Sequence, residues 1–168
     1  MLSVVHQNVQ SIGNSINQLN MVVSETLKND DLCAVCITEH WKTKEQISNF
    51  GIDGFILASA FCRDYNEHGG AAIYVKEGLK FSERVDLLNL SVKNVMEIAA
   101  VDVRCSDRDL LVVSVYAASG ESARFLGEFE KILEMVSSSD RMIVIGGDFN
   151  IDLLSPTNRW SVEDKSVL

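Results

Sequence analysis

The sequence predicts an α/β or α+β layered sandwich, in which helices pack outside β-sheets. Two segments, residues 11–28 and 121–137, carry apolar residues at helical spacing. Several short apolar runs bounded by Gly, Asn or Asp have the length and composition of strands. Because strands and helices alternate near both ends of the chain, the helices are expected to cover the sheets from outside.

The first part of the chain is expected to form a strand at residues 2–8, a helix at 11–28 and a strand at 32–38. The apolar face of this helix consists of Ile12, Ile16, Leu19, Val23 and Leu27. Their spacings of three and four residues are typical of an amphipathic helix with one side in a core.

The middle of the chain is predicted to be an antiparallel meander. Its strands are expected at residues 55–61, 71–76, 80–88, 95–104 and 109–117.

The last elements expected are a helix at residues 121–137 and a strand at 141–147. The helix has one apolar stripe, made of Phe125, Phe129, Ile132, Leu133 and Val136. After Asn150 the sequence contains its only proline and a polar end, with no further strand pattern. We therefore expect residues 1–168 to be one domain that is incomplete at its C-terminal side, with strands missing there.

Composition excludes several classes of protein. The chain has 168 residues, 46% hydrophobic and 23% charged, as in an ordinary globular domain. No apolar run approaches the roughly 18 residues that span a bilayer, and the N-terminus lacks a signal-peptide pattern. We expect an intracellular protein, nuclear or cytoplasmic, neither secreted nor bound to a membrane. The cysteines show no disulfide spacing, so free thiols are expected, and the pair Cys33 and Cys36 within a strand does not favour a zinc site.

The formal charge of −9 argues against nucleic-acid binding through a large basic surface. A metal-dependent phosphodiesterase, however, needs acids at its centre, and a divalent cation reverses the local charge.

Polar residues stand where four predicted strands end. Asn8 closes the first strand, Glu39 follows the second, Tyr116 lies near the end of the strand at 109–117, and Asp148 and Asn150 follow the strand at 141–147. Each of these side chains can ligate a hard cation or bond a phosphoryl oxygen. The pattern indicates one polar site built from strand ends.

Every one of these residues also has a purely structural interpretation. Glu39 can be a solvated acid, and Asp148 and Asn150 can be turn formers. Asn8 can cap the following helix, and Tyr116 can be an ordinary strand aromatic. The functional interpretation gains strength because four separate strand ends carry such residues.

The order of the motifs resembles the endonuclease/exonuclease/phosphatase superfamily. The matching segments are N-V-Q-S at 8–11, I-T-E-H-W at 37–41, H-G-G-A-A-I-Y-V at 68–75, S-V-Y-A at 114–117 and G-G-D-F-N at 146–150. Within the superfamily they are most similar to the endonuclease domain of non-LTR, LINE-type, jockey-like retrotransposons. The resemblance covers the chain from Leu2 to about Asn150 and implies a four-layer α/β/β/α sandwich of two mixed sheets flanked by helices.

The resemblance also implies roles for the candidate residues. Glu39 would bind Mg²⁺, with Mn²⁺ as a substitute, and Asn8 would assist it. Asp148 would orient and deprotonate the attacking water. Asn150 and the Tyr116 hydroxyl would donate hydrogen bonds to the phosphoryl oxygens in the transition state. The implied reaction is metal-assisted hydrolysis of a phosphodiester, with DNA as substrate and a reverse transcriptase domain in the full-length parent.

One departure from the family pattern affects activity. The late-strand Asp and the C-terminal Ser-Asp-His motif have no counterpart, and no histidine occurs after His68. We expect the chain as given to be impaired for this reason. Two alternatives remain: a non-catalytic remnant or binding module of the same fold, and a phosphatase or phosphodiesterase acting on inositol phosphates or phospholipids. His40 is expected to be a loop histidine, and neither His6 nor His68 has a partner at metal-ligand spacing.

Overall fold

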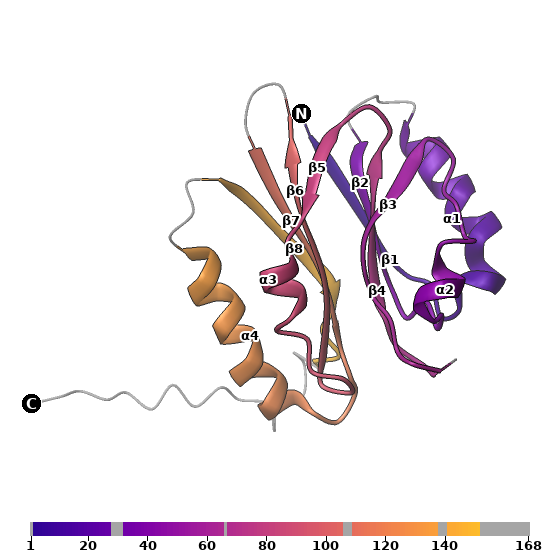
Figure 1. Ribbon diagram of the computed structural model, residues 1–168. Helices are drawn as coiled ribbons and strands as arrows, with labels where there is room; N and C mark the ends of the chain where they lie inside the picture. The colour runs from indigo at the N-terminus through magenta and orange to yellow at the C-terminus, as the bar shows by residue number, and fades with distance from the viewer. Residues whose placement is uncertain (1, 28–31, 66, 106–108, 138–140, 152–168) are drawn as a thin grey trace, which may run out of the picture.

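The computed structural model describes residues 2–27, 32–65, 67–105, 109–137 and 141–151. Within these ranges the chain forms β1 (Ser3–Asn8), α1 (Ile12–Leu27), β2 (Leu32–Thr38), α2 (Lys44–Ile47), β3 (Phe55–Phe61), β4 (Ala71–Lys76), β5 (Lys80–Glu83), α3 (Val85–Leu88), β6 (Met96–Arg104), β7 (Asp109–Ala117), α4 (Ser122–Ser137) and β8 (Met142–Asp148). Figure 1 shows these elements in four layers: helices, sheet, sheet and helices. The predicted α/β/β/α sandwich is confirmed.

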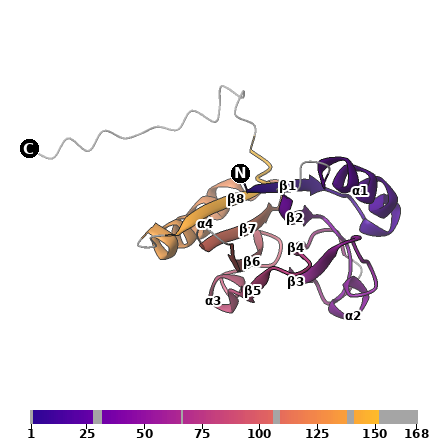
Figure 2. The ribbon, with the colours of Figure 1, turned by 90° about the horizontal axis from the view of Figure 1, so that it is seen from above.

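Both sheets contain four strands and are mixed. The first has the order β1-β2-β4-β3, with β1 and β2 parallel and the other pairs antiparallel. The second has the order β5-β6-β7-β8, with β7 and β8 parallel and the others antiparallel. The predicted antiparallel meander is present as β5-β6-β7, while the β3-β4 hairpin belongs to the other sheet. Seen from above, α1 and α2 lie outside the first sheet, and α3 and α4 lie outside the second (Figure 2).

Three apolar clusters fill the spaces between the layers. Ile12, Leu19 and Val23 of α1 pack against the first sheet. Phe125 and Ile132 of α4 pack against the second sheet. The cluster between the two sheets is made of side chains from β2, β4, β6 and β7, namely Cys33, Ala34, Cys36, Ala71, Ile73, Val75, Ala99, Val101, Val103, Leu110 and Val112. The central strands are therefore buried on both faces, which explains why they consist of nearly continuous apolar residues.

Two helical turns differ from the prediction. The strand expected at residues 80–88 ends at Glu83, the last residue of β5 to pair with β6, and the chain turns into α3. Arg84 Nε and Nη2 donate to the two carboxylate oxygens of Asp86 at 2.8 and 2.6 Å, and Leu87 is buried. The short helix α2 was not predicted, because four residues are too few to show a helical period.

The remaining predicted elements are present, with boundaries that shift by one residue at most. Residue 28 of the predicted first helix lies outside the described residues, as do residues 152–168. Among the helices of the described ranges, none combines the length and the apolar character that crossing a bilayer requires.

Candidate active site

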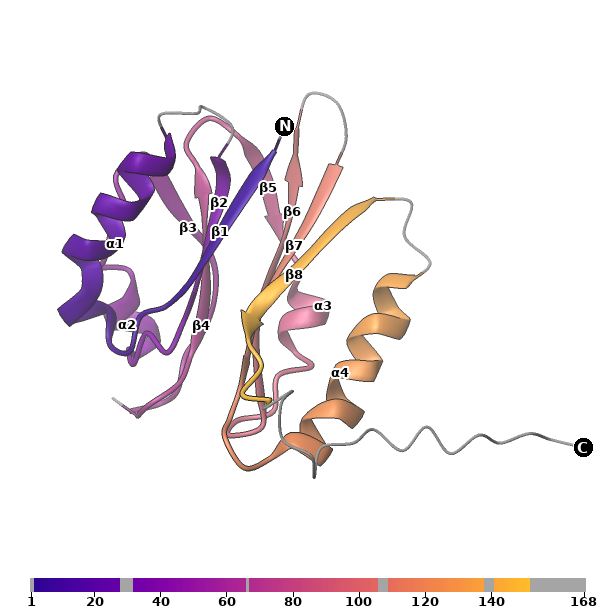
Figure 3. The ribbon, with the colours of Figure 1, turned by 180° about the vertical axis from the view of Figure 1, so that it is seen from behind.

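Four strand ends meet at one end of the sandwich. Because β1 runs parallel to β2 and β7 runs parallel to β8, each pair delivers its carboxyl ends to the same side. Figure 3 shows β1 and β8 side by side at the seam between the sheets, both running toward this end. Asn8 and Asp148 are the last residues of these two strands.

Asn8 joins the two candidate acids. Its Nδ2 atom donates to Glu39 Oε1 at 2.9 Å and to Asp148 Oδ2 at 2.6 Å. Its Oδ1 atom accepts a hydrogen bond from the backbone N–H of Gln10 at 3.2 Å, so Asn8 shapes the turn after β1 and lies four residues before α1 begins. One amide thus holds a carboxylate from each sheet, and both acids are only partly buried.

Glu39 adopts a left-handed backbone conformation, with φ of 56°. A non-glycine residue in this region is sparsely populated and persists where neighbouring contacts fix it. The Glu39 N–H donates to Gly70 O at 2.8 Å, and Glu39 Oε2 accepts a hydrogen bond from Trp41 Nε1 at 3.3 Å. The carboxylate is therefore oriented by Asn8 on one oxygen and by Trp41 on the other.

Asp148 and Asn150 form the turn that follows β8. Asp148 Oδ1 accepts from the Asn150 N–H at 3.2 Å, which leaves Oδ2 for Asn8. Asn150 has φ of 46°, and its Nδ2 atom donates to Ala117 O at 2.7 Å. The turn-forming interpretation therefore holds for both residues, and the turn itself points the Asp148 carboxylate at Asn8.

Tyr116 lies beside the acids, opposite Asp148 in the β7–β8 register. It is 8% exposed. Burial raises the pKa of its hydroxyl above the ordinary value, and the negative charges of Glu39 and Asp148 act in the same direction. The Tyr116 hydroxyl therefore stays protonated and able to donate at neutral pH.

A buried carboxylate that the sequence analysis missed supports this arrangement. Glu97 on β6 pairs with Tyr116 in the sheet and is fully buried. Its Oε1 atom accepts from Arg63 Nε at 2.7 Å, from Arg63 Nη2 at 2.6 Å and from the Asn94 N–H at 3.2 Å, and its Oε2 atom accepts from the Gly70 N–H at 2.6 Å. The signal in the sequence was an acid flanked by apolar residues inside a predicted strand.

Glu97 is linked to Glu39 through a single glycine. The Gly70 N–H donates to Glu97, and the Gly70 carbonyl accepts from the Glu39 N–H. Gly70 has φ of 93°, and a Cβ atom there would collide with the His40 ring. The Glu97 carboxylate on the second sheet therefore helps, through Gly70, to fix the backbone of Glu39 at the end of the first sheet.

His40 lies in the loop after β2, as predicted, but its side chain is buried. It is 0% exposed. Its Nδ1 atom accepts from the Lys42 N–H at 3.1 Å, so Nε2 carries the proton and donates to Phe61 O at 2.9 Å. Burial lowers the pKa of His40 to about 4, which keeps the ring neutral.

The other two histidines lie near the candidate site. His6 Nε2 on β1 lies 3.2 Å from Thr38 Oγ1. Burial lowers the pKa of His6, although the negative charge of Asp148 acts in the opposite direction. His68 stacks on Trp41 at the rim of the site.

None of the four cysteines, which all lie within the described residues, is part of a disulfide bond, as predicted. Burial raises the pKa of Cys33 to about 11 and that of Cys36 to about 12, so these thiols are protonated and unreactive. Within the described part of the chain, no three His, Cys, Asp or Glu side chains are grouped closely enough to hold a metal ion by themselves.

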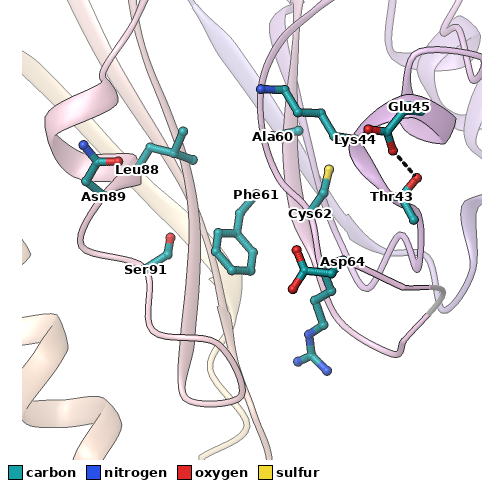
Figure 4. Close-up of a pocket in the computed structure, with 11 residues that line it drawn as sticks. Thr43, Lys44, Glu45, Ala60, Phe61, Cys62, Asp64, Leu88, Asn89 and Ser91 are labelled. Atoms are coloured by element: carbon teal, nitrogen blue, oxygen red, sulfur yellow. Dashed lines mark hydrogen bonds between the residues drawn. The ribbon is translucent and has the colours of Figure 1, made fainter.

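A separate groove of about 540 Å³ lies between α2 and α3 (Figure 4). Phe61 and Cys62 line the groove between the residues of α2 and those at the end of α3. None of the residues that line it belongs to the cluster of Asn8, Glu39 and Asp148, so the groove is not the candidate active site.

No family model and no curated protein sequence matches the chain, but its fold is similar to solved structures. The endonuclease domain of TRAS1, a telomere-specific non-LTR retrotransposon, matches with a TM-score of 0.62 and 15% identity, over 90% of this chain and 60% of that domain. D. rerio TDP2, solved with a single-strand DNA product, matches with a TM-score of 0.63 and 12% identity, over 90% and 61% of the two chains. The mannosyl-6-phosphatase Bt3783 of Bacteroides thetaiotaomicron matches with a TM-score of 0.56 and 16% identity, over 94% and 68%.

The chain thus spans about 60% of the length of the retrotransposon endonuclease domain and of D. rerio TDP2. Identities this low establish a shared fold. A further similar structure is described as an endonuclease/exonuclease/phosphatase family protein. The resemblance seen in the sequence motifs is therefore confirmed at the level of architecture: this chain has the fold of the endonuclease/exonuclease/phosphatase superfamily.

Proposed function

We propose that this chain is a metal-dependent phosphodiesterase domain that nicks DNA, derived from a non-LTR retrotransposon endonuclease. The observation that supports the proposal most strongly is the Asn8 amide, which holds Glu39 and Asp148 together from two different sheets. Two carboxylates that accept from the same amide nitrogen lie close enough to repel one another, and a bound cation would offset that repulsion. The similarity of the fold to nucleases and phosphatases points the same way.

The donor set fits a hard divalent cation. Mg²⁺ commonly uses one or two protein carboxylates and keeps several waters, so a large cluster of protein ligands is not required. Glu39 would hold the ion, and Asn8 would fix the orientation of Glu39. For Asn8 to become a ligand itself, its amide would have to turn, because its Nδ2 atom faces the acids and its Oδ1 atom faces Gln10. When bound, the cation would supply Lewis-acid polarisation of the scissile phosphate.

The remaining groups have distinct roles in the proposed reaction. Asp148, held by Asn8 and the Asn150 backbone, would orient a water molecule and accept its proton. Tyr116 would donate its hydroxyl proton in a hydrogen bond to a phosphoryl oxygen. Asn150 uses one amide hydrogen on Ala117 O and retains the second for the phosphate.

The proposal extends to the parent protein. DNA would be the substrate, a reverse transcriptase domain would follow in the full-length protein, and the location would be nuclear or cytoplasmic. Residues 1–168 would form one domain whose C-terminal strands and Ser-Asp-His motif belong to a longer chain. Without the histidine that would stabilise the phosphate, the isolated chain is expected to cleave weakly.

Two other functions have specific support. Similarity to a mannosyl-6-phosphatase favours a phosphomonoesterase or phospholipid phosphatase that uses the same acids. The net charge of −9 favours a non-catalytic binding module. Turnover of a phosphate monoester without DNA cleavage would select the first of these, and the absence of both activities and of cation binding would select the second.

The decisive test is nicking of supercoiled plasmid in the presence of Mg²⁺. We would compare this chain with a version extended by the corresponding C-terminal segment of a homologous endonuclease. Nicking by the extended protein should fall at least about 100-fold in Glu39→Gln and in Asp148→Asn, since each loses a group used only in the transition state or on the cation. Glu77→Gln is the matched control, because Glu77 is an exposed acid in the turn after β4 at the opposite end of the sheet. Nicking that persists in both site variants would refute the assignment.

A further inference from the structure

Two aromatic rings form a parallel stack at the rim of the candidate site. The rings of Trp41 and His68 have centroids 4.0 Å apart and planes inclined by 8°. Trp41 Nε1 donates to Glu39 Oε2 at 3.3 Å, so the stack is in direct contact with the carboxylate proposed to hold the cation. Trp41 is partly buried, while His68 is exposed.

The stack is held in place by the backbone. The Trp41 N–H donates to Gly69 O at 3.1 Å, and Trp41 has a left-handed φ of 56°. Gly69, which follows His68, has φ of 123°, and a Cβ atom there would collide with the Arg63 guanidinium. Arg63 is in turn fixed by Glu97, so the two rings are ordered before any ligand binds. Binding therefore does not include the entropy cost of ordering these side chains.

The stack can bind nucleic acid without relying on electrostatic attraction, which the acids beside it do not supply. Glu39 and Asp148 repel a polyanion, and a chain with net charge −9 gains little affinity from phosphate contacts. Stacking of an unpaired base on an aromatic ring contributes about 1–3 kcal/mol and needs no cationic group. An exposed ring next to the acids therefore supplies the kind of affinity that this surface otherwise lacks.

We propose that Trp41 and His68 form a stacking platform that binds an unpaired nucleobase beside the scissile phosphate. This inference rests on the proposed function, because it assigns the adjoining site to a nucleic-acid substrate. The platform selects DNA whose bases are unpaired or extruded, since a base inside a duplex is already stacked on both faces. Trp41 and His68 thereby place the sugar-phosphate backbone over Glu39 and Asp148.

The test is equilibrium binding in EDTA, measured by fluorescence anisotropy with two labelled single-stranded oligothymidylates of equal length. One is intact, and the other contains abasic sites at every internal position, so both carry the same phosphate charge. The wild-type chain should bind the intact strand at least about fivefold more tightly, the low end of what one stacked base contributes. His68→Ala should abolish this preference, and His68→Phe should retain it because the ring is kept.

A control variant separates the platform from the catalytic proposal. None of the interactions that fix the Trp41–His68 stack involves Asp148. Asp148→Asn should therefore keep the preference for the intact strand, while the extended protein that carries it should lose nicking. Equal binding of the two strands, or a preference that survives His68→Ala, would overturn the platform while leaving the nicking result to decide the proposed function. Failure to bind either strand, combined with turnover of a hexose phosphate, would overturn both.

Discussion

The strands at the middle of each sheet differ from the strands at the seam between the sheets. Every residue of β2 is buried, and in β7 only the first residue is exposed. Along β1 and β8, by contrast, almost every residue is only partly buried. Yet Asn8 and Asp148, which hold the site together, end the two partly buried strands. The central strands thus form the buried core and position Glu39 and Tyr116, while β1 and β8 end in the side chains that connect Glu39 to Asp148.

The largest expected effect is at a central strand, at Glu97. Glu97→Ala removes the buried partner of the Arg63 guanidinium, whose side chain is only 9% exposed, and leaves only the longer contact of 4.0 Å to Glu67 Oε2. Removing one member of a buried ion pair costs about 3–5 kcal/mol. Urea unfolding should show a loss of this size. The double variant Glu97→Met, Arg63→Met should lose clearly less, and equal losses in both proteins would show that the buried charge is not the cause.

A matched pair of substitutions tests the difference between the strands directly. Ile37 on β2 is fully buried, and Ile143 on β8 is partly buried. Ile37→Ala should lower the free energy of unfolding by about 2–5 kcal/mol, because it leaves a cavity between packed layers. Ile143→Ala should cost about half as much, since less apolar area leaves water when β8 folds. Similar losses at the two positions would contradict the division between central and seam strands.

Acidification should lower the free energy of unfolding through His40, which follows the central strand β2. The folded-state pKa of His40 is about 4, below its ordinary 6.5, so the unfolded chain binds the extra proton first as pH falls. Stability should therefore decrease from about pH 6.5 downward, by about 2 kcal/mol between pH 7 and pH 5. His6 shifts in the same direction. His40→Gln should flatten the slope over this interval, and an unchanged slope would exclude His40 as its source.

The smallest effect on stability is expected at the seam. Asp148→Asn removes one of two carboxylates that share the Asn8 amide, so the unfolding free energy should change by no more than about 0.5 kcal/mol. A thermal or urea denaturation curve that overlays the wild type would show that Asp148 serves the site rather than the fold. A loss above about 2 kcal/mol would instead assign Asp148 a structural role.

Much of the fold was predictable because most of its strands are buried on two faces. Continuous apolar runs at residues 32–38 and 109–117 have the length and composition of buried strands, and the helical stripes of α1 and α4 are visible in the sequence. The turn into α3 was missed, since it depends on the local Arg84–Asp86 pair rather than on a period. Short helices of this kind carry too few residues for a pattern.

The candidate site was predictable residue by residue but not as a set of contacts. Glu39 and Asp148 each stand after an apolar run, which drew attention to them. Both acids are connected through Asn8. The bond from Asn8 to Asp148 joins residues 140 positions apart, and it depends on how the two sheets pack. Glu97 was missed for the same reason, because its partners Arg63 and Gly70 lie in the connection between β3 and β4, beside the opposite sheet.

The central claim is that Glu39, oriented by Asn8 at the seam, holds a divalent cation. Mn²⁺ titration followed by electron paramagnetic resonance tests this claim without requiring catalysis, using the wild-type chain, Glu39→Gln and the distant control Glu77→Gln. The wild type and Glu77→Gln should bind one Mn²⁺ ion with equal affinity, and Glu39→Gln should bind it at least about tenfold more weakly. Equal Mn²⁺ affinity in all three proteins would show that Glu39 does not hold the ion.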